Sequence, residues 1–188
     1  MRRLLVITGL VLGALALVPA AGAEAAEKLP EPVIAVLDSQ RVLRDSKAGR
    51  DIRRQIDAYR KAYQAEIKAE EAKLRQIEDK LKRQRAVLAP DIFEKRRREF
   101  EQRVISLQRR VQDRTRALDR AFDSAMRELR KPLIPLVRDL TRRSGYNLVV
   151  DNSQVLMALK GRDITESVIA QLDKRISSMK VPEPTIAK

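Results

Sequence analysis

The sequence predicts an α+β protein that is mostly α-helical, in which a long antiparallel helical hairpin projects from a small β-stranded association body. Charged residues make up 35% of the chain and aromatic residues 3%, a composition typical of long helices or coiled coils. Through the middle of the chain, apolar residues recur at spacings of three, four and seven, as in a coiled coil. Two strand-bearing segments bracket this region, so we expect them to meet at its base.

The first 23 residues match a cleavable secretory signal peptide. Arg2 and Arg3 precede an apolar run from Leu4 to Val18, and an Ala-x-Ala signature ends at Ala23. The run is shorter than the roughly 20 apolar residues that a membrane anchor needs. We expect cleavage after Ala23 and a linker over 24–32. The mature chain then keeps about +12 of the formal net charge of +14, and this charge acts outside the cytoplasm.

The first part of the association body is predicted over 33–48. A continuous apolar run over 33–37, bounded by Pro32 and Asp38, is typical of a buried strand. Asp38 or Ser39 can cap a short helical turn that follows it. Residues 45–49 are expected to interrupt this turn.

The hairpin arm is predicted over 49–131, with its tip near 86–92. Neither glycine nor proline occurs between Arg50 and Ala89, so one helix about 60 Å long is expected there. Pro90 breaks that helix and Asp91 is placed to cap the next one. The two helices have matching lengths and a short connection, so they fold back on each other.

The apolar seam of this hairpin is thin. Glu70, Arg97 and Arg114 fall at or beside positions that should be apolar. We therefore expect the far end of the arm to be splayed and bendable.

The chain returns to the body over 132–176. The sequence predicts a helix over 133–143 that ends at Gly145, strands over 146–150 and 155–159, and a closing amphipathic helix that begins near Asp163. The tail over 177–188 is expected to be disordered.

The predicted body is too small to be stable as one copy. Units of this size usually need oligomerisation or covalent staples, and the chain has no cysteine. Self-association through the strands is therefore expected, giving a homo-oligomer. The candidate subunit-association residues are the apolar ones of the predicted strands: Val33, Ile34, Val36, Leu148, Val149, Val150, Val155 and Leu156.

Catalysis has little support in the sequence. Without cysteine or histidine there is no thiol nucleophile, no imidazole base and no thiolate or imidazole metal site. The adjacent carboxylates Glu70-Glu71 and Glu78-Asp79 face different directions on a helix and form no acid/base pair. No glycine-rich phosphate loop is present. We therefore predict that the chain is not an enzyme and that it uses no cofactor or metal.

Two basic clusters flank the predicted tip, around a short apolar stretch. One interpretation is a solvated helix surface for the charges and local packing for the apolar residues. The other is a cationic tip that contacts acidic polypeptides or an anionic membrane surface. The candidate contact residues are Lys80, Lys82, Arg83, Arg85, Val87, Leu88, Ile92, Phe93, Lys95, Arg96, Arg97 and Arg98.

Three segments of the mature chain resemble the Skp (OmpH-like) family of periplasmic chaperones. They are IAVLDSQRVLRDSKAG from Ile34, GYNLVVDNSQVL from Gly145 and DITESVIAQLD from Asp163, with the charged hairpin between the first two. The resemblance implies a trimeric holdase whose β-stranded bodies associate and whose helical arms enclose unfolded outer-membrane proteins. It also implies affinity for lipopolysaccharide or anionic phospholipid.

Two other classes of function are compatible with part of the sequence. A structural or adaptor coiled coil of the cell envelope would need only the hairpin. A nucleic-acid-binding coiled coil is favoured by the pI of about 10.5. The export signal and the scarcity of aromatic residues for stacking oppose that second class, so no nucleic-acid partner is expected.

Overall fold

The computed structural model describes residues 30–186 of the 188-residue chain. The chain divides into two units, Met1–Glu31 and Pro32–Lys188, and every element below belongs to the second unit. The expected signal peptide over 1–23, and residues 24–29 of the expected linker, lie outside the described residues.

The first strand, β1 (Ile34–Leu37), leads into the short helix α1 (Ser39–Asp45). Asp38 caps α1, because its side chain accepts a hydrogen bond from the Arg41 backbone N–H at 2.7 Å. Ser46 then caps the next helix by accepting from the Gly49 N–H at 3.2 Å. The expected interruption over 45–49 therefore shrinks to the single residue Ser46.

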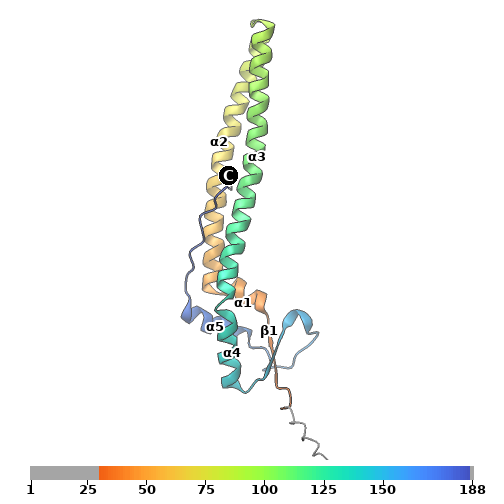
Figure 1. The fold of residues 1–188 in the computed structure, drawn as a ribbon, viewed down its shortest axis with the longest axis vertical. Helices are drawn as coiled ribbons and strands as arrows, with labels where there is room; N and C mark the ends of the chain where they lie inside the picture. Colours follow the sequence, from red (N-terminus) through yellow and green to blue (C-terminus); the bar gives the residue numbers. More distant parts are fainter. Residues whose placement is uncertain (1–29, 187–188) are drawn as a thin grey trace, which may run out of the picture. The chain divides into compact units, whose positions relative to one another are not determined.

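The hairpin consists of α2 (Lys47–Gln84) and α3 (Pro90–Arg130), which run side by side in Figure 1. Pro90 is the first residue of α3, a position where its missing N–H removes no helical hydrogen bond. The expectation that Asp91 caps α3 is wrong. The N-cap is Ala89, which makes no side-chain cap bond, and Asp91 lies in the first turn.

Burial along the hairpin is concentrated near the body. There the buried apolar side chains are Ala48, Ile52, Ile56, Tyr63, Ala117, Leu118, Ala121, Ala125 and Leu129. In the distal half of the described hairpin, Leu81 and Leu107 are the apolar side chains that remain buried. The seam is therefore thin toward the tip, as the sequence predicts.

The return segment begins with α4 (Leu133–Ser144), which ends at Gly145 in the left-handed conformation with φ 74°. Strand β2 (Leu148–Asp151) follows and pairs with β1 in parallel, with Ile34 opposite Leu148. Parallel strands need a long crossover, and here α1, the hairpin and α4 form it.

The expected third strand over 155–159 is wrong. The chain turns through the 3₁₀ helix η1 (Asn152–Gln154), since the Asp151 carboxylate accepts a hydrogen bond from the Ser153 N–H at 3.0 Å. Beyond its pairing with β2, β1 makes one isolated β-bridge, between Val36 and Asp163. Val36 donates to the Arg162 carbonyl at 2.8 Å.

The closing helix α5 (Thr165–Arg175) is present as predicted, with Val168 and Leu172 fully buried. The tail is not disordered over 177–186. These residues form no helix or strand, but Val181 is only 1% exposed because it packs in the same apolar cluster as α2 and α5. No helix in the described range is long and apolar enough to cross a membrane.

Candidate functional site

The two basic clusters meet at one end of the arm. Lys80, Lys82, Arg83 and Arg85 lie at the end of α2, and the second cluster lies in the first turns of α3. All of these side chains are exposed. The Arg96 guanidinium donates to the Gln84 side-chain oxygen at 2.7 Å, which links the clusters across the turn.

Local acidic residues neutralise part of this charge. Lys82 pairs with Glu78 at 2.8 Å, and this hydrogen bond raises the pKa of Lys82. Arg97 pairs with Glu94 at 2.7 Å and with Glu101 at 3.1 Å. The hydrogen bond from Arg97 lowers the pKa of Glu94.

The other cations of the tip face solvent. Within residues 30–186 no ion pair or hydrogen bond engages them. They are Lys80, Arg83, Arg85, Lys95 and Arg98. Below we call these five residues the unpaired tip cations.

The four apolar candidates of the tip divide into two pairs. Val87 is 82% exposed and Ile92 is 42% exposed, so both are open to contact. Leu88 and Phe93 are half-buried at the turn. The structure thus supports local packing for the second pair and leaves the first pair at the surface.

Shallow clefts lie between the two helices just below the tip. Two of them, of about 240 and 230 Å³, share Ile77 and Arg103 among their lining residues. Each cleft therefore combines aliphatic surface with a guanidinium group. Such a lining can accept an extended chain that carries both apolar and acidic side chains.

The candidate association residues lie on both faces of the two-stranded sheet. Val149 packs against the apolar core with Ala35 and Leu37. The opposite face carries the register partners Ile34 and Leu148, which are 40% and 45% exposed. Of these two groups, the second is available to another chain.

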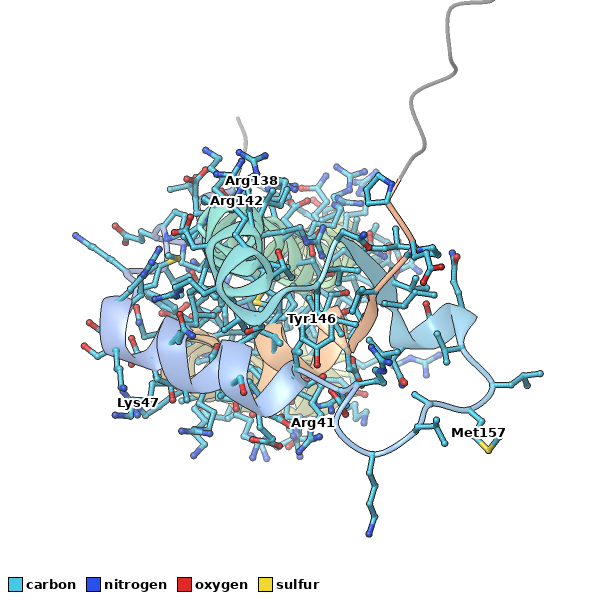
Figure 2. The ribbon with its side chains drawn as sticks, turned by 90° about the horizontal axis from the view of Figure 1, so that it is seen from below. Arg41, Lys47, Arg138, Arg142, Tyr146 and Met157 are labelled. Atoms are coloured by element: carbon cyan, nitrogen blue, oxygen red, sulfur yellow. The ribbon has the colours of Figure 1, made fainter. Side chains whose placement is uncertain are left out.

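The loop after β2 extends this open apolar face. Leu156 is fully exposed and Met157 is 84% exposed, and Met157 points away from the body in Figure 2. A cleft of about 370 Å³ lies between the loop and the sheet. Of the remaining candidates, Val33 is exposed, Val36 is buried under the loop, and Val150 and Val155 are half-buried.

Sequence reasoning missed a carboxylate that joins three segments of the body. Asp151 accepts hydrogen bonds from the hydroxyls of Ser153 and Ser39, each at 2.6 Å. The Ser153 bond, followed by the Ser39 bond, holds the pKa of Asp151 far below its ordinary value. The position of an aspartate directly after an apolar strand was the one signal for this role.

A second missed feature lies halfway along the arm. The Arg114 guanidinium lies 4.0 Å from the centre of the Tyr63 ring and also pairs with Glu66 at 3.1 Å. An arginine at a seam position is thereby stabilised by a cation–π contact and by an ion pair between α3 and α2.

The adjacent carboxylates Glu70 and Glu71 pair with basic neighbours on the same helix. Glu70 pairs with Lys73 at 2.9 Å, while Glu71 pairs with Arg75 at 3.8 Å. Each carboxylate thus points to its own basic neighbour. In the described part of the chain, no group of three or more acidic side chains could hold a metal ion.

Comparisons with known proteins agree with this architecture. A crystal structure of a candidate outer membrane chaperone (OmpH-like) from Caulobacter crescentus CB15 is similar with a TM-score of 0.77 and 20% sequence identity. The alignment covers 84% of this chain and 93% of that one, so the two share a fold. No curated protein sequence matches the chain.

The family model for outer membrane protein (OmpH-like) matches residues 33–172. The match begins one residue before β1 and ends within α5, so it covers both parts of the body and the complete arm. The chain therefore belongs to the OmpH-like family.

Proposed function

We propose that the chain is an ATP-independent holdase chaperone of the periplasm. It binds unfolded outer-membrane proteins and prevents their aggregation before they insert into the outer membrane. The observation that carries this proposal is the distal arm, which combines unpaired cations, exposed apolar side chains and shallow clefts in a member of the OmpH-like family.

The arm can hold a client without chemistry. The excess of basic over acidic residues raises the rate at which an acidic unfolded chain encounters the arm. Weak contacts with Val87, Ile92 and the clefts below the tip then keep aggregation-prone segments apart. Many weak contacts on linked arms give avidity while each single contact remains reversible.

The proposed active form is a homotrimer that associates through the open sheet face. Ile34, Leu148 and Leu156 support this assembly, since isolated chains would leave them in water. The N-terminal leader supports export to the periplasm. In that compartment the tip cations also fit the phosphates of lipopolysaccharide or of anionic phospholipid.

The direct test uses the mature chain, residues 24–188, and a urea-denatured outer-membrane β-barrel protein. Light scattering after dilution from urea measures aggregation, and we expect suppression at about one trimer per client. The suppression should weaken at high salt because exposed charges are then screened.

Two outcomes would favour other functions. If aggregation were unchanged while the chain bound one folded envelope protein tightly, it would be an adaptor. Retention of the precursor in the cytoplasm, together with binding to DNA or RNA, would identify a nucleic-acid-binding coiled coil.

A further inference from the structure

The C-terminal segment over 177–186 lies along the lower arm in an extended conformation. It leaves α5 and passes beside α2, and its described part reaches partway along the hairpin in Figure 1. Val181 and Pro184 are buried, whereas most of their neighbours in the segment are exposed. Two side chains therefore anchor a segment that otherwise faces water.

The arm holds this segment mainly by its backbone. The Gln55 side-chain amide donates to the Met179 carbonyl at 2.9 Å and accepts from the Val181 N–H at 3.0 Å. Asp51 accepts from the Met179 N–H at 3.3 Å. These contacts recognise a peptide backbone, and they do not depend on which side chains the peptide carries.

The same pattern continues toward the tip. The Tyr63 hydroxyl donates to the Pro184 carbonyl at 3.0 Å, and Arg120 donates to the Thr185 carbonyl at 3.2 Å. Gln55 and Tyr63 are eight residues apart, about 12 Å along the helix. Three extended residues, from Val181 to Pro184, span about 10 Å. The spacing of Gln55 and Tyr63 on α2 is thus close to that of the Val181 N–H and the Pro184 carbonyl that they bind.

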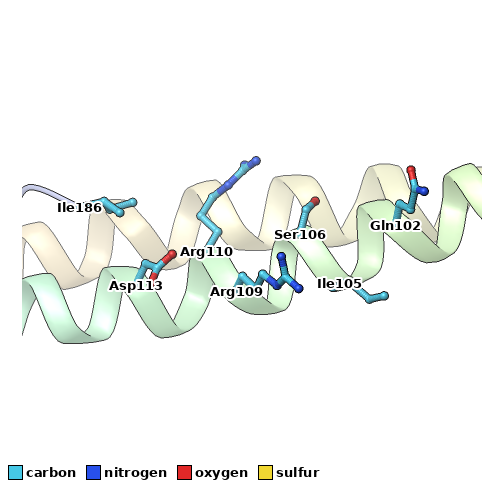
Figure 3. Close-up of a pocket in the computed structure, with 7 residues that line it drawn as sticks. All are labelled: Gln102, Ile105, Ser106, Arg109, Arg110, Asp113 and Ile186. Carbon is cyan, nitrogen blue, oxygen red and sulfur yellow. The ribbon is translucent and has the colours of Figure 1, made fainter. Parts of the chain in front are cut away.

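We define the backbone-binding track as Asp51, Gln55, Tyr63 and Arg120. The track leads into a further cleft of about 540 Å³ at the middle of α3. Ile186 occupies one end of this cleft, while Ile105, farther along α3, is 47% exposed (Figure 3). The C-terminal segment therefore covers the lower part of a longer surface.

We propose that the backbone-binding track is a site for an extended segment of an unfolded polypeptide, which the C-terminal segment fills when no client is bound. This inference rests on the proposed chaperone function. Within residues 178–186 no backbone–backbone hydrogen bond joins the segment to the rest of the described chain, so its release breaks the side-chain hydrogen bonds of the track and the packing of Val181 and Pro184 but no strand pairing. A longer client segment gains the open cleft beyond Ile186 in addition.

The absence of cysteine allows a clean distance measurement in the full mature chain. Spin labels at Glu183→Cys and Gln64→Cys report the position of the C-terminal segment relative to α2. A control pair at Gln64→Cys and Gln112→Cys reports the hairpin alone, since both positions are exposed. Distances are measured by pulsed electron paramagnetic resonance before and after addition of a urea-denatured β-barrel protein.

Without client we expect one short distance between positions 64 and 183. Bound client should convert it to a broad distribution at longer distances and leave the control pair defined. If the client is bound and kept soluble while the distance between 64 and 183 stays short, the track inference is wrong and the proposed function stands. If no client binds to the chain, the proposed function is wrong and the inference falls with it.

A substitution pair gives a second, independent readout. Val181→Asp places a carboxylate in the buried anchor and should free the track, whereas Ser178→Asp adds the same charge at an exposed position. If the segment fills the track nine-tenths of the time, Val181→Asp tightens the apparent Kd for the client about tenfold. Equal affinities for the two variants, with both folded by circular dichroism, would overturn the inference.

Discussion

At the residue scale, Gly49 permits the close approach of α1 and α2. A Cβ added at this position would lie 1.8 Å from the Leu43 backbone oxygen, a contact that flexible side chains cannot relieve. We expect Gly49→Ala to lower the free energy of unfolding by about 2 kcal/mol, since the clash outweighs the better helix propensity of alanine. Urea denaturation at fixed protein concentration measures this change.

Gly145→Ala is the matched control for that prediction. Gly145 has a positive φ but nothing lies within 4 Å of an added Cβ, so only backbone strain of about 1 kcal/mol is expected. If Gly49→Ala were as stable as the natural chain, the close approach would not constrain this position.

Asp151 gives a prediction about pH. Its pKa is lowered in the folded chain by the Ser153 and Ser39 hydroxyls, so its stabilising contribution is present above its unfolded pKa of about 3.9 and is lost as pH falls through the folded pKa. We expect Asp151→Asn to lower the free energy of unfolding by about 1 kcal/mol at pH 7, because an amide keeps only part of the hydrogen bonding.

The measurement for Asp151 is the urea midpoint of both chains at pH 7, 5 and 3. The difference in urea midpoint between the natural chain and Asp151→Asn should be constant from pH 7 to 5 and should shrink toward pH 3. The control is Asp123→Asn, which changes an exposed carboxylate that has no ion pair among the described residues. Its urea midpoint should equal that of the natural chain at each pH. A difference for Asp151→Asn that grew on acidification would contradict the sign of this argument.

At the scale of elements, the unpaired tip cations should set the rate of client capture. Replacing Arg83, Arg85 and Lys95 by glutamine should slow association with an acidic unfolded chain severalfold at low salt, with little effect on dissociation. Stopped-flow fluorescence of a labelled client measures both rates. At about 0.5 M salt the variant and the natural chain should associate equally fast.

The control for the tip replaces three exposed cations elsewhere on the arm, Lys61, Lys68 and Arg127, which removes the same net charge. A smaller effect of this control would assign the steering to the tip. Equal effects of both triple variants would mean that net charge alone matters and that the tip has no special role.

The elements also show how far the sequence could predict the fold. Local signals were sufficient where one residue decides a boundary, as with Pro90 at the start of α3 and Gly145 at the end of α4. The third strand was predicted wrongly over 155–159, because an apolar run alone does not specify a partner for β1. Its second neighbour is a bridge at Asp163, which only the tertiary arrangement provides.

The candidate site was predictable to a similar extent. The hairpin fold implies that the two basic clusters are adjacent. Which of their cations form ion pairs depends on the side-chain rotamers of Glu78 and Glu94, and the sequence spacing does not determine these rotamers. The C-terminal segment was missed because it has no periodic pattern. Its prolines and Val181 favour an extended chain, yet Asp51, Gln55 and Tyr63, which bind it, lie more than 100 positions away in the sequence.

At the scale of the whole molecule, the open sheet face should hold the chains together. Ile34 and Leu148 lie opposite each other in the register and both are exposed, so aspartate at both positions alters the open face without placing a charge in the core of the single chain. We expect the double variant Ile34→Asp/Leu148→Asp to change the mass in solution from a trimer to a monomer. Light scattering coupled to size-exclusion chromatography measures this mass.

The tip provides a chemically matched control, because Val87→Asp/Ile92→Asp also replaces two exposed aliphatic residues and should leave the trimer intact. The two double variants then separate assembly from client contact. Loss of the sheet contacts should abolish aggregation suppression at equal chain concentration, since one arm cannot surround a client and avidity between arms is lost. The tip variant should weaken suppression only partly, because the cations and clefts remain. A monomer that suppressed aggregation as well as the natural chain would show that a single arm is sufficient, and the assembly would then serve another purpose.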